Sequence, residues 1–275
     1  MAEQLRVVLR PRALLESMDL ALAFLGRESR CLLMPFTAAV LVAWALQESL
    51  DGEPLRQWIG VVLLTPLFER LATALLGSRL VGADVGLGGA LRRAGAQPFS
   101  ALGACLLPMM PLLVMLAGFE RGDDELGATL IGAGAVVGMA WPFVVARWAL
   151  TSTSAVLEGH GVGRALKRSS ILSSHEFGRL TGFLVLSFCL RLAFVAVAEM
   201  AHVFLWGFVL QLGTPQSLGS GAGSSVVTLS AWIIAGMGVA NFRLFEYVSL
   251  RIQTDAWDLQ VRFRALAARH WGPRT

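Results

Sequence analysis

Six apolar segments, each close to the length of a membrane span, constrain this chain more than any other feature. A helix that crosses the hydrocarbon core of a bilayer needs about 20 mostly apolar residues. Of the 275 residues, 55% are hydrophobic and 15% are charged, whereas about a quarter of an ordinary soluble domain is charged. The segments are residues 31–47, 58–76, 99–119, 128–150, 180–200 and 226–250. The sequence therefore predicts an all-α, polytopic membrane protein with six transmembrane helices, formed by a single domain over residues 1–275.

Arginine and lysine are divided unequally between the predicted loops. Eighteen of these basic residues fall on one side of the six spans, and only Arg56 and Arg121 fall on the other, where two loops are acidic. Cytoplasmic loops carry the excess of Lys and Arg, so we expect both termini in the cytoplasm. The predominance of Arg, with Lys167 as the single lysine, and the richness in Ala, Gly and Leu are typical of a bacterial protein. The expected location is a bacterial cytoplasmic (inner) membrane.

Amphipathic segments flank the spans. Hydrophobic residues recur at helical spacing in the N-terminal segment 1–30 and in the C-terminal tail 251–275, which predicts interfacial helices near residues 12–27 and 251–269. Two more are expected near residues 82–94 and 160–175. The apolar run 202–213 is too short to cross a bilayer, so it is either a continuation of the fifth helix or a re-entrant or interfacial piece.

A glycine-rich stretch at residues 154–174 carries Arg164, Lys167 and Arg168. A phosphate-binding loop needs a strand before its glycines and a helix that begins at them. Here the preceding residues are the end of a membrane helix, and the glycine spacing fits no nucleotide-binding pattern. The three basic residues are instead predicted to contact anionic lipid headgroups.

Several short motifs give the chain a family resemblance. They comprise Arg-Pro-Arg at residues 10–12, then Glu158, Gly161, Ala165, Leu166, Arg168, Ser169 and Arg179, and finally Tyr247, Leu250, Arg251, Trp257 and Asp258. With these motifs the sequence resembles the bacterial glycerophosphoryl diester phosphodiesterase membrane-domain family. That resemblance implies six membrane helices. The soluble barrel that performs hydrolysis in some members needs about 200 residues or more of alternating strands and helices, a pattern absent from this sequence. The resemblance therefore implies a membrane module without the esterase.

The sequence contains no recognisable catalytic or metal-binding motif. His175 and Glu176 begin like a zinc-protease helix, but the second histidine is missing. The three cysteines, Cys31, Cys105 and Cys189, lie in or at the ends of spans, which is typical of packing residues. We expect no enzyme activity, no cofactor and no nucleic-acid partner.

Ionisable residues inside the predicted spans are the main candidates for a site, because burying them in a bilayer is costly. The candidate polar cluster comprises Glu69, Arg70, Arg191, Asn241, Arg243 and Glu246. In one interpretation, Glu69–Arg243 and Arg70–Glu246 are ion pairs that fix helix packing, and Arg191 has no assigned partner. In the other, the cluster lines a cavity that binds an anionic headgroup or relays an ion.

The sequence therefore favours a non-enzymatic inner-membrane module that acts as a scaffold or accessory to a membrane-protein partner and contacts the bilayer, including anionic phospholipid. The alternative is a small transporter or lipid-handling protein with a polar cavity between spans two, five and six. An intramembrane enzyme without a recognisable motif is the third hypothesis.

Overall fold

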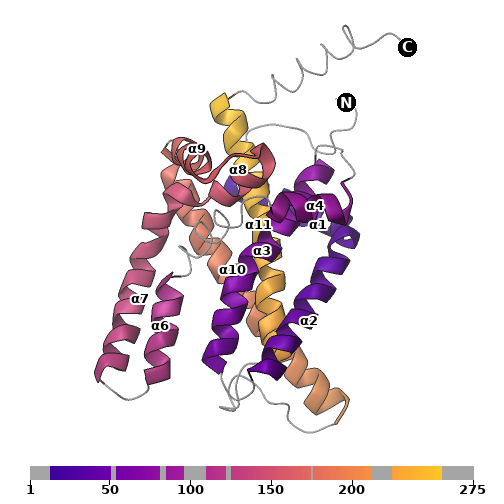
Figure 1. Cartoon of the computed structure of the whole chain (residues 1–275), viewed down its shortest axis with the longest axis vertical. Helices are drawn as coiled ribbons and strands as arrows, with labels where there is room; N and C mark the ends of the chain where they lie inside the picture. Colours follow the sequence, from indigo (N-terminus) through magenta and orange to yellow (C-terminus); the bar gives the residue numbers. More distant parts are fainter. Residues whose placement is uncertain are drawn as a thin grey trace.

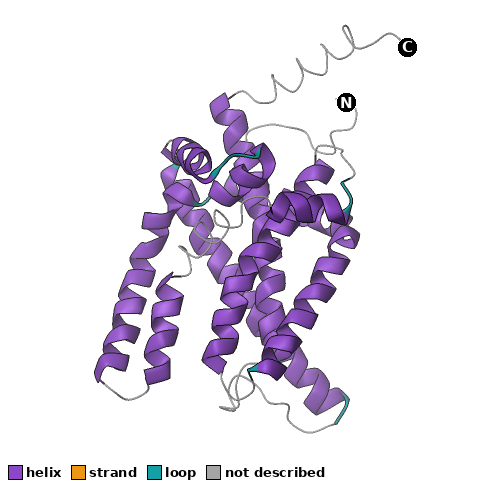
Figure 2. Cartoon of the chain, in the orientation of Figure 1, coloured by secondary structure: helices purple, strands orange, loops and turns teal. Residues whose placement is uncertain are grey.

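The structure is a computed structural model, and it describes residues 13–50, 54–80, 85–95, 110–121, 125–174, 176–211 and 225–255. Within these ranges every regular element is a helix (Figure 2). The longer α-helices are α1 (Leu14–Glu28), α2 (Leu33–Ser49), α3 (Pro54–Leu80), α7 (Glu125–Val145), α10 (Phe177–Val203) and α11 (Val226–Asp255). The shorter ones are α4 (Leu87–Gly95), α6 (Met110–Arg121), α8 (Thr151–Glu158) and α9 (Val162–Ser174).

Among the residues that the structure describes, five helical stretches are long and apolar enough to cross a membrane. They are Leu14–Ser49, Arg56–Leu80, Glu125–Phe143, Phe177–Val209 and Val226–Thr254. The first joins α1 to α2 through a 3₁₀ turn at Ser29–Leu32, so the predicted interfacial helix and the predicted first span form one helical stretch. The third predicted span, residues 99–119, is described only from Met110 onward, as α6. Six crossings therefore stay a prediction.

Helix α11 lies at the centre of the bundle, against α1, α2, α3 and α10 (Figure 1). Its side chains are buried almost throughout, whereas most of those on α7 are exposed. A fully buried helix in a membrane bundle contacts other helices, and a helix with apolar exposed side chains faces lipid. The core therefore follows α3 and α11, and α7 belongs to the periphery.

Helices α6 and α7 form a hairpin beside this core (Figure 1). A Cβ atom at Gly134 would lie 2.5 Å from Met115 Cγ and 3.2 Å from the Pro111 carbonyl oxygen. The glycine therefore allows α6 to approach the backbone of α7 closely. The hairpin packs mainly on itself and only lightly on α3 and α10.

The short apolar run after the fifth span continues α10 as a π-helical turn, Phe204–Val209. This decides between the alternatives raised by its length, in favour of a continuous helix. The predicted interfacial helix at 251–269 does not begin as a separate helix at residue 251, because Arg251 to Asp255 form the end of α11. The residues that follow lie outside the described part.

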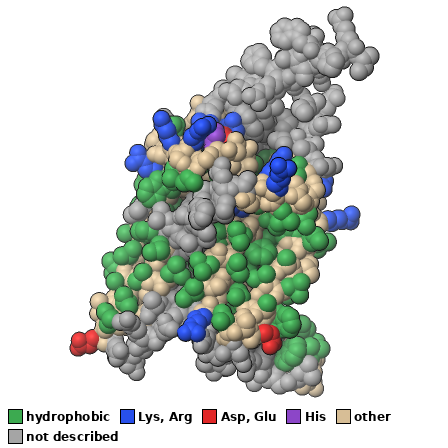
Figure 3. Space-filling view, in the orientation of Figure 1, with side chains coloured by type: hydrophobic (Ala, Val, Ile, Leu, Met, Phe, Trp, Pro, Cys, Tyr) green, Lys and Arg blue, Asp and Glu red, His purple; other side chains and the backbone are tan. Residues whose placement is uncertain are grey.

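Helices α1, α4, α8 and α9 lie at one end of the molecule, together with the C-terminal end of α11 (Figure 1). Lys and Arg side chains gather over these elements (Figure 3). The C-terminal end of α6 and the beginnings of α7, α3 and α11 lie at the opposite end. We call the first end the basic end of the bundle.

Candidate functional site

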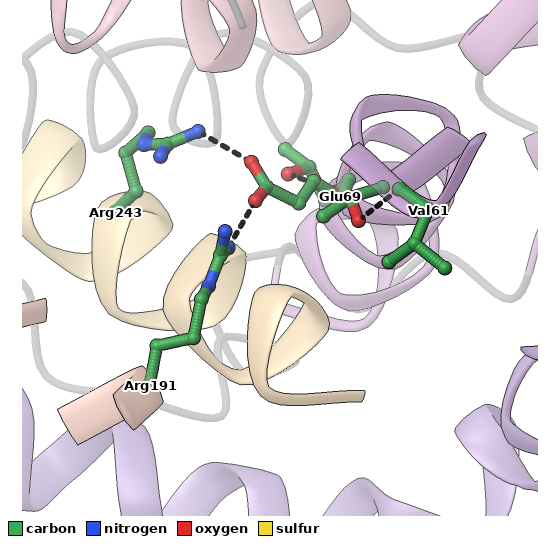
Figure 4. Close-up of polar contacts among 6 residues, drawn as sticks. Val61, Glu69, Arg191 and Arg243 are labelled. Atoms are coloured by element: carbon green, nitrogen blue, oxygen red, sulfur yellow. Dashed lines mark hydrogen bonds and ion pairs between the residues drawn. The ribbon is translucent and has the colours of Figure 1, made fainter. Parts of the chain in front are cut away.

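Glu69 lies between two arginines from different helices in the middle of the bundle. Its Oε1 forms an ion pair with Arg191 Nη2, and its Oε2 is 3.0 Å from Arg243 Nη1. Figure 4 shows the carboxylate of α3 reaching between Arg191 of α10 and Arg243 of α11. The predicted Glu69–Arg243 pair is present, and Arg191, which has no assigned partner in the sequence interpretation, shares the same carboxylate.

The surroundings of this three-residue ion cluster hold it tightly. Glu69 is 4% exposed and Arg191 is 3% exposed. The guanidinium carbon of Arg191 lies 5.0 Å from the centre of the Trp232 ring, a distance at which the ring face attracts a cation. A Cβ atom at Gly236 would lie 2.9 Å from Arg191 Nη2 and 3.2 Å from Glu69 Oε1. Gly236 therefore provides the space in which the cluster forms.

Two guanidinium groups share one carboxylate in this cluster, which leaves it with one more positive than negative charge. Arg191 Nη1 is buried and has no hydrogen-bond partner among the described residues. Arg70, the next residue on α3, is also buried. An unpaired donor on a charged group is costly in a low-dielectric interior, so an anion near Arg191 would be stabilised.

A lateral groove reaches this cluster from the periphery. Its volume is about 530 Å³, and it lies between the α6–α7 hairpin and the α10–α11 pair. Its walls are mostly apolar, with Met115, Met139 and Phe188 among them, and its polar lining includes Arg191 and Arg243. The groove therefore does not lie between the second, fifth and sixth predicted spans, as the sequence predicts. Helix α3, the second span, contributes Glu69 to the ion cluster but no residue to the lining of the groove.

The other members of the predicted polar cluster have separate roles in packing. The partner predicted for Glu246 from helix depth is Arg70, whereas the structure pairs Glu246 with Arg179, with 2.9 Å between Oε2 and Nη2. Asn241 donates a 2.6 Å hydrogen bond from Nδ2 to the carbonyl of Ala21 on α1. The six predicted residues therefore do not form one site.

Arg179 is a functional candidate that the sequence interpretation assigns to a loop. Helix α10 begins at Phe177, three residues before the predicted start of the fifth span, and so Arg179 belongs to the helix. Its Nη2 also lies 3.2 Å from Ser249 Oγ. A predicted fifth span that began at Phe177 would have included Arg179.

The three predicted headgroup contacts on α9 differ from one another. Arg164 and Lys167 are exposed at the basic end. Arg168 Nε lies instead 3.8 Å from Glu158 Oε2. Ala165 is fully buried against the protein, because this face of α9 packs on the 3₁₀ turn after α7, where Ser169 Oγ donates to the Arg147 carbonyl over 3.0 Å.

Glu158, the last residue of α8, contacts several side chains that no single sequence motif predicts. Tyr247 donates its hydroxyl hydrogen to Glu158 Oε1, Arg251 Nη1 lies 2.8 Å from the same oxygen, and His160 Nδ1 lies 2.9 Å from Oε2. Gly159 follows in the left-handed region, with φ of 66°, which glycine adopts without strain. Glu158, Tyr247 and Arg251 belong to the motifs that carry the family resemblance, and they are in contact although they are distant in sequence.

Another buried carboxylate, that of Glu199, lies at the end of the bundle opposite the basic end. Glu199 Oε2 accepts hydrogen bonds from Ser225 Oγ at 2.9 Å and from Thr228 Oγ1 at 2.6 Å. Ser225 Oγ also accepts from the Thr228 backbone N–H, as an N-cap residue does. A carboxylate at a helix N-terminus is stabilised by the helix dipole, so this group has a structural explanation at the start of α11.

The fold and the site together define a class. In the described part of the chain the protein is all-helical, with five helical stretches long and apolar enough to cross a membrane, as expected of a membrane protein, and a charged cluster among them. No protein-family model, no curated protein and no solved structure matches the chain. The resemblance to the phosphodiesterase membrane-domain family is therefore carried by the quoted motifs alone.

Proposed function

We propose that this chain is a membrane-embedded lipid-handling protein that holds the acidic head of an amphipathic anion in the groove between the α6–α7 hairpin and α10–α11. The observation that carries the proposal is the joining of an apolar groove of about 530 Å³ to two arginines at its wall. Ligand sites are typically apolar cavities of about 300–1,000 Å³ with a few convergent polar groups.

The two parts of the groove suit the two parts of an amphiphile. An acyl or alkyl chain would lie against the methionine and phenylalanine side chains, and methionine adapts readily to chains of different shape. The acidic head would approach Arg191, whose Nη1 has no partner among the described residues. The anion would offset the excess positive charge of the cluster. This is a binding role, and we propose no catalytic step.

The finer assignments of topology and location belong to the same proposal. We infer six crossings, with the basic end in the cytoplasm of a bacterium and the protein in its inner membrane. Exposed Arg164 and Lys167 would contact anionic headgroups, each contributing about 1 kcal/mol near a charged surface. The membership implied by the quoted motifs remains a resemblance.

A scaffold that holds a membrane-protein partner is the second candidate function. It is favoured by the way Glu69 joins α3, α10 and α11 through two ion pairs, since removal of one partner from a buried pair destabilises a protein by about 3–5 kcal/mol. In a pure scaffold, the cluster would stabilise the bundle without any response to ligand.

Thermal unfolding of the purified protein in a neutral detergent tests the proposal. Dodecanoate and tetradecanoate are the anionic probes, and dodecanol and dodecyltrimethylammonium are the neutral and cationic comparisons. We expect the melting temperature to rise only with the anionic probes, because a ligand at 100 times its Kd stabilises the folded state by about 2.7 kcal/mol.

Two variants locate the effect. Ala135→Trp, on the α7 wall of the groove, adds an indole ring to the groove without replacing a residue of the ion cluster and should abolish the response. Arg92→Gln, an exposed arginine of α4 outside the lining of the groove, should retain it. A rise with all four probes, or a response that survives in Ala135→Trp, contradicts the groove; a stable parent with no anionic response supports the scaffold instead.

A further inference from the structure

A second cavity lies at the basic end of the bundle, separate from the lateral groove. It has a volume of about 120 Å³ and lies between α3, α4, α8 and α11. Its polar lining consists of Ser78, Arg93 and Arg251, and no carboxylate is among the described residues that line it. Because a water molecule occupies about 30 Å³ in the liquid, the space is that of a few waters or of one tetrahedral oxyanion.

The helices around this cavity are held in place by contacts that do not depend on a ligand. Arg251 is fixed by its 2.8 Å contact with Glu158, and Tyr247 on the same helix bonds to that carboxylate. On the opposite wall, a Cβ atom at Gly77 would lie 2.5 Å from Leu157 Cδ2, so α3 and α8 are in close contact. The cavity is therefore bounded by packed elements.

Arg93 supplies the second cationic wall. It lies on α4, whose Ala90 and Ala94 are buried against the protein, and its own side chain is exposed. Two guanidinium groups from different helices thus border one small space. Arginine binds phosphate through paired N–H donors, and a phosphate monoester carries a charge of about −1.5 to −2 at neutral pH. Arg93 supplies a cation to this anion, and Arg251 supplies a second guanidinium group that also pairs with Glu158.

We propose that this cavity is a binding site for a phosphate monoester group, held by Arg93 and Arg251. The phosphate group is the shared chemistry of two sources, a soluble phosphate compound and the headgroup of an anionic lipid such as phosphatidic acid. The site lies at the basic end, where Lys and Arg side chains gather (Figure 3) and raise the local concentration of anions. It does not depend on the lateral groove.

The test measures thermal unfolding of the detergent-solubilised full chain with two probes. Sodium phosphate at pH 7.5 is compared with sodium chloride of equal ionic strength, and dioctanoyl phosphatidic acid is compared with dioctanoylglycerol. We expect a rise in melting temperature with at least one phosphate probe over its own comparison. Sodium phosphate alone indicates a soluble source, and phosphatidic acid alone indicates the lipid headgroup.

Neighbouring arginines on α4 provide the matched variants. Arg93→Gln should weaken the apparent affinity for the responding probe at least tenfold, whereas Arg92→Gln, exposed on the same helix and outside the lining of the cavity, should leave it unchanged. Arg93 is chosen because Arg251 also holds Glu158, and its removal would disturb the fold. No response to either phosphate probe, or equal losses in the two variants, would overturn the proposal.

Discussion

At the scale of single residues, the ion cluster in the middle of the bundle depends on a glycine, Gly236, which has no side chain. Gly236 lies where α11 passes the ion pair between Glu69 and Arg191, and any Cβ atom there would also meet Thr65 Cγ2 at 2.8 Å. The side chains that would have to move are buried and joined to one another. A methyl group at this position would therefore distort the ion cluster, because the neighbouring side chains cannot rotate away into open space.

Alanine at two nearby glycines tests this. Gly236→Ala should lower the stability by about 1–3 kcal/mol, as overpacking of a core does, and should lower the melting temperature in neutral detergent. Gly238→Ala is the control, because a Cβ atom added there would have no neighbouring atom within 4 Å and alanine is the better helix former by about 0.5–1 kcal/mol. Equal melting temperatures for the two variants would contradict the packing argument.

Residue types and depth predict part of this site. Ionisable residues in apolar spans are costly unless paired, which selects Glu69, Arg191 and Arg243 from the sequence. Which of them meet depends on helix neighbours and tilt, and hydropathy carries no information on either. Thus Arg191 shares the carboxylate of Glu69, and Arg179, placed in a loop by a helix start predicted three residues late, pairs with Glu246.

At the scale of elements, the α6–α7 hairpin determines whether a groove exists. Its two helices pack closely on one another through Gly134 and Gly118 and only lightly on the rest of the bundle. The glycine pair at positions 134 and 138 in the sequence indicates close helix packing, and within the chain the partner is α6. The groove itself follows from how far the hairpin lies from α10, which no local pattern encodes.

A pair of glycines on α7 separates hairpin packing from helix propensity. Gly134→Ala should destabilise the protein by about 1–3 kcal/mol, since its Cβ would lie 3.1 Å from the Met115 backbone nitrogen as well as against that side chain. Gly132→Ala, with nothing within 4 Å, should be neutral or slightly stabilising. Thermal unfolding in neutral detergent measures both, and a larger loss in Gly132→Ala would show that the hairpin packs through another face.

At the scale of the whole molecule, the uneven distribution of Lys and Arg agrees with the arrangement of the helices. The elements predicted to lie inside the cell, α1, α4, α8 and α9, share one end of the structure, and Lys and Arg gather there (Figures 1 and 3). The C-terminal end of α6 and the beginning of α7 lie at the other end. The third predicted span, residues 99–119, lies in sequence after α4 and includes most of α6, so the positions of α4 and the end of α6 at opposite ends agree with the prediction that this span crosses.

Reporter insertions in a bacterial host test which side of the membrane each end of the bundle faces. Green fluorescent protein inserted after Gly95, within the Gly159–Gly161 turn, or after Thr275 should report the cytoplasm, because the excess of Lys and Arg keeps these segments inside. Alkaline phosphatase, which needs disulfides that form in the periplasm, should be active when inserted between α6 and α7, at residues 122–124, and inactive at those three cytoplasmic positions. Insertions after Gly95 and at 122–124 that report the same side would show that residues 99–119 do not cross, and alkaline phosphatase activity at Gly161 would reverse the proposed orientation.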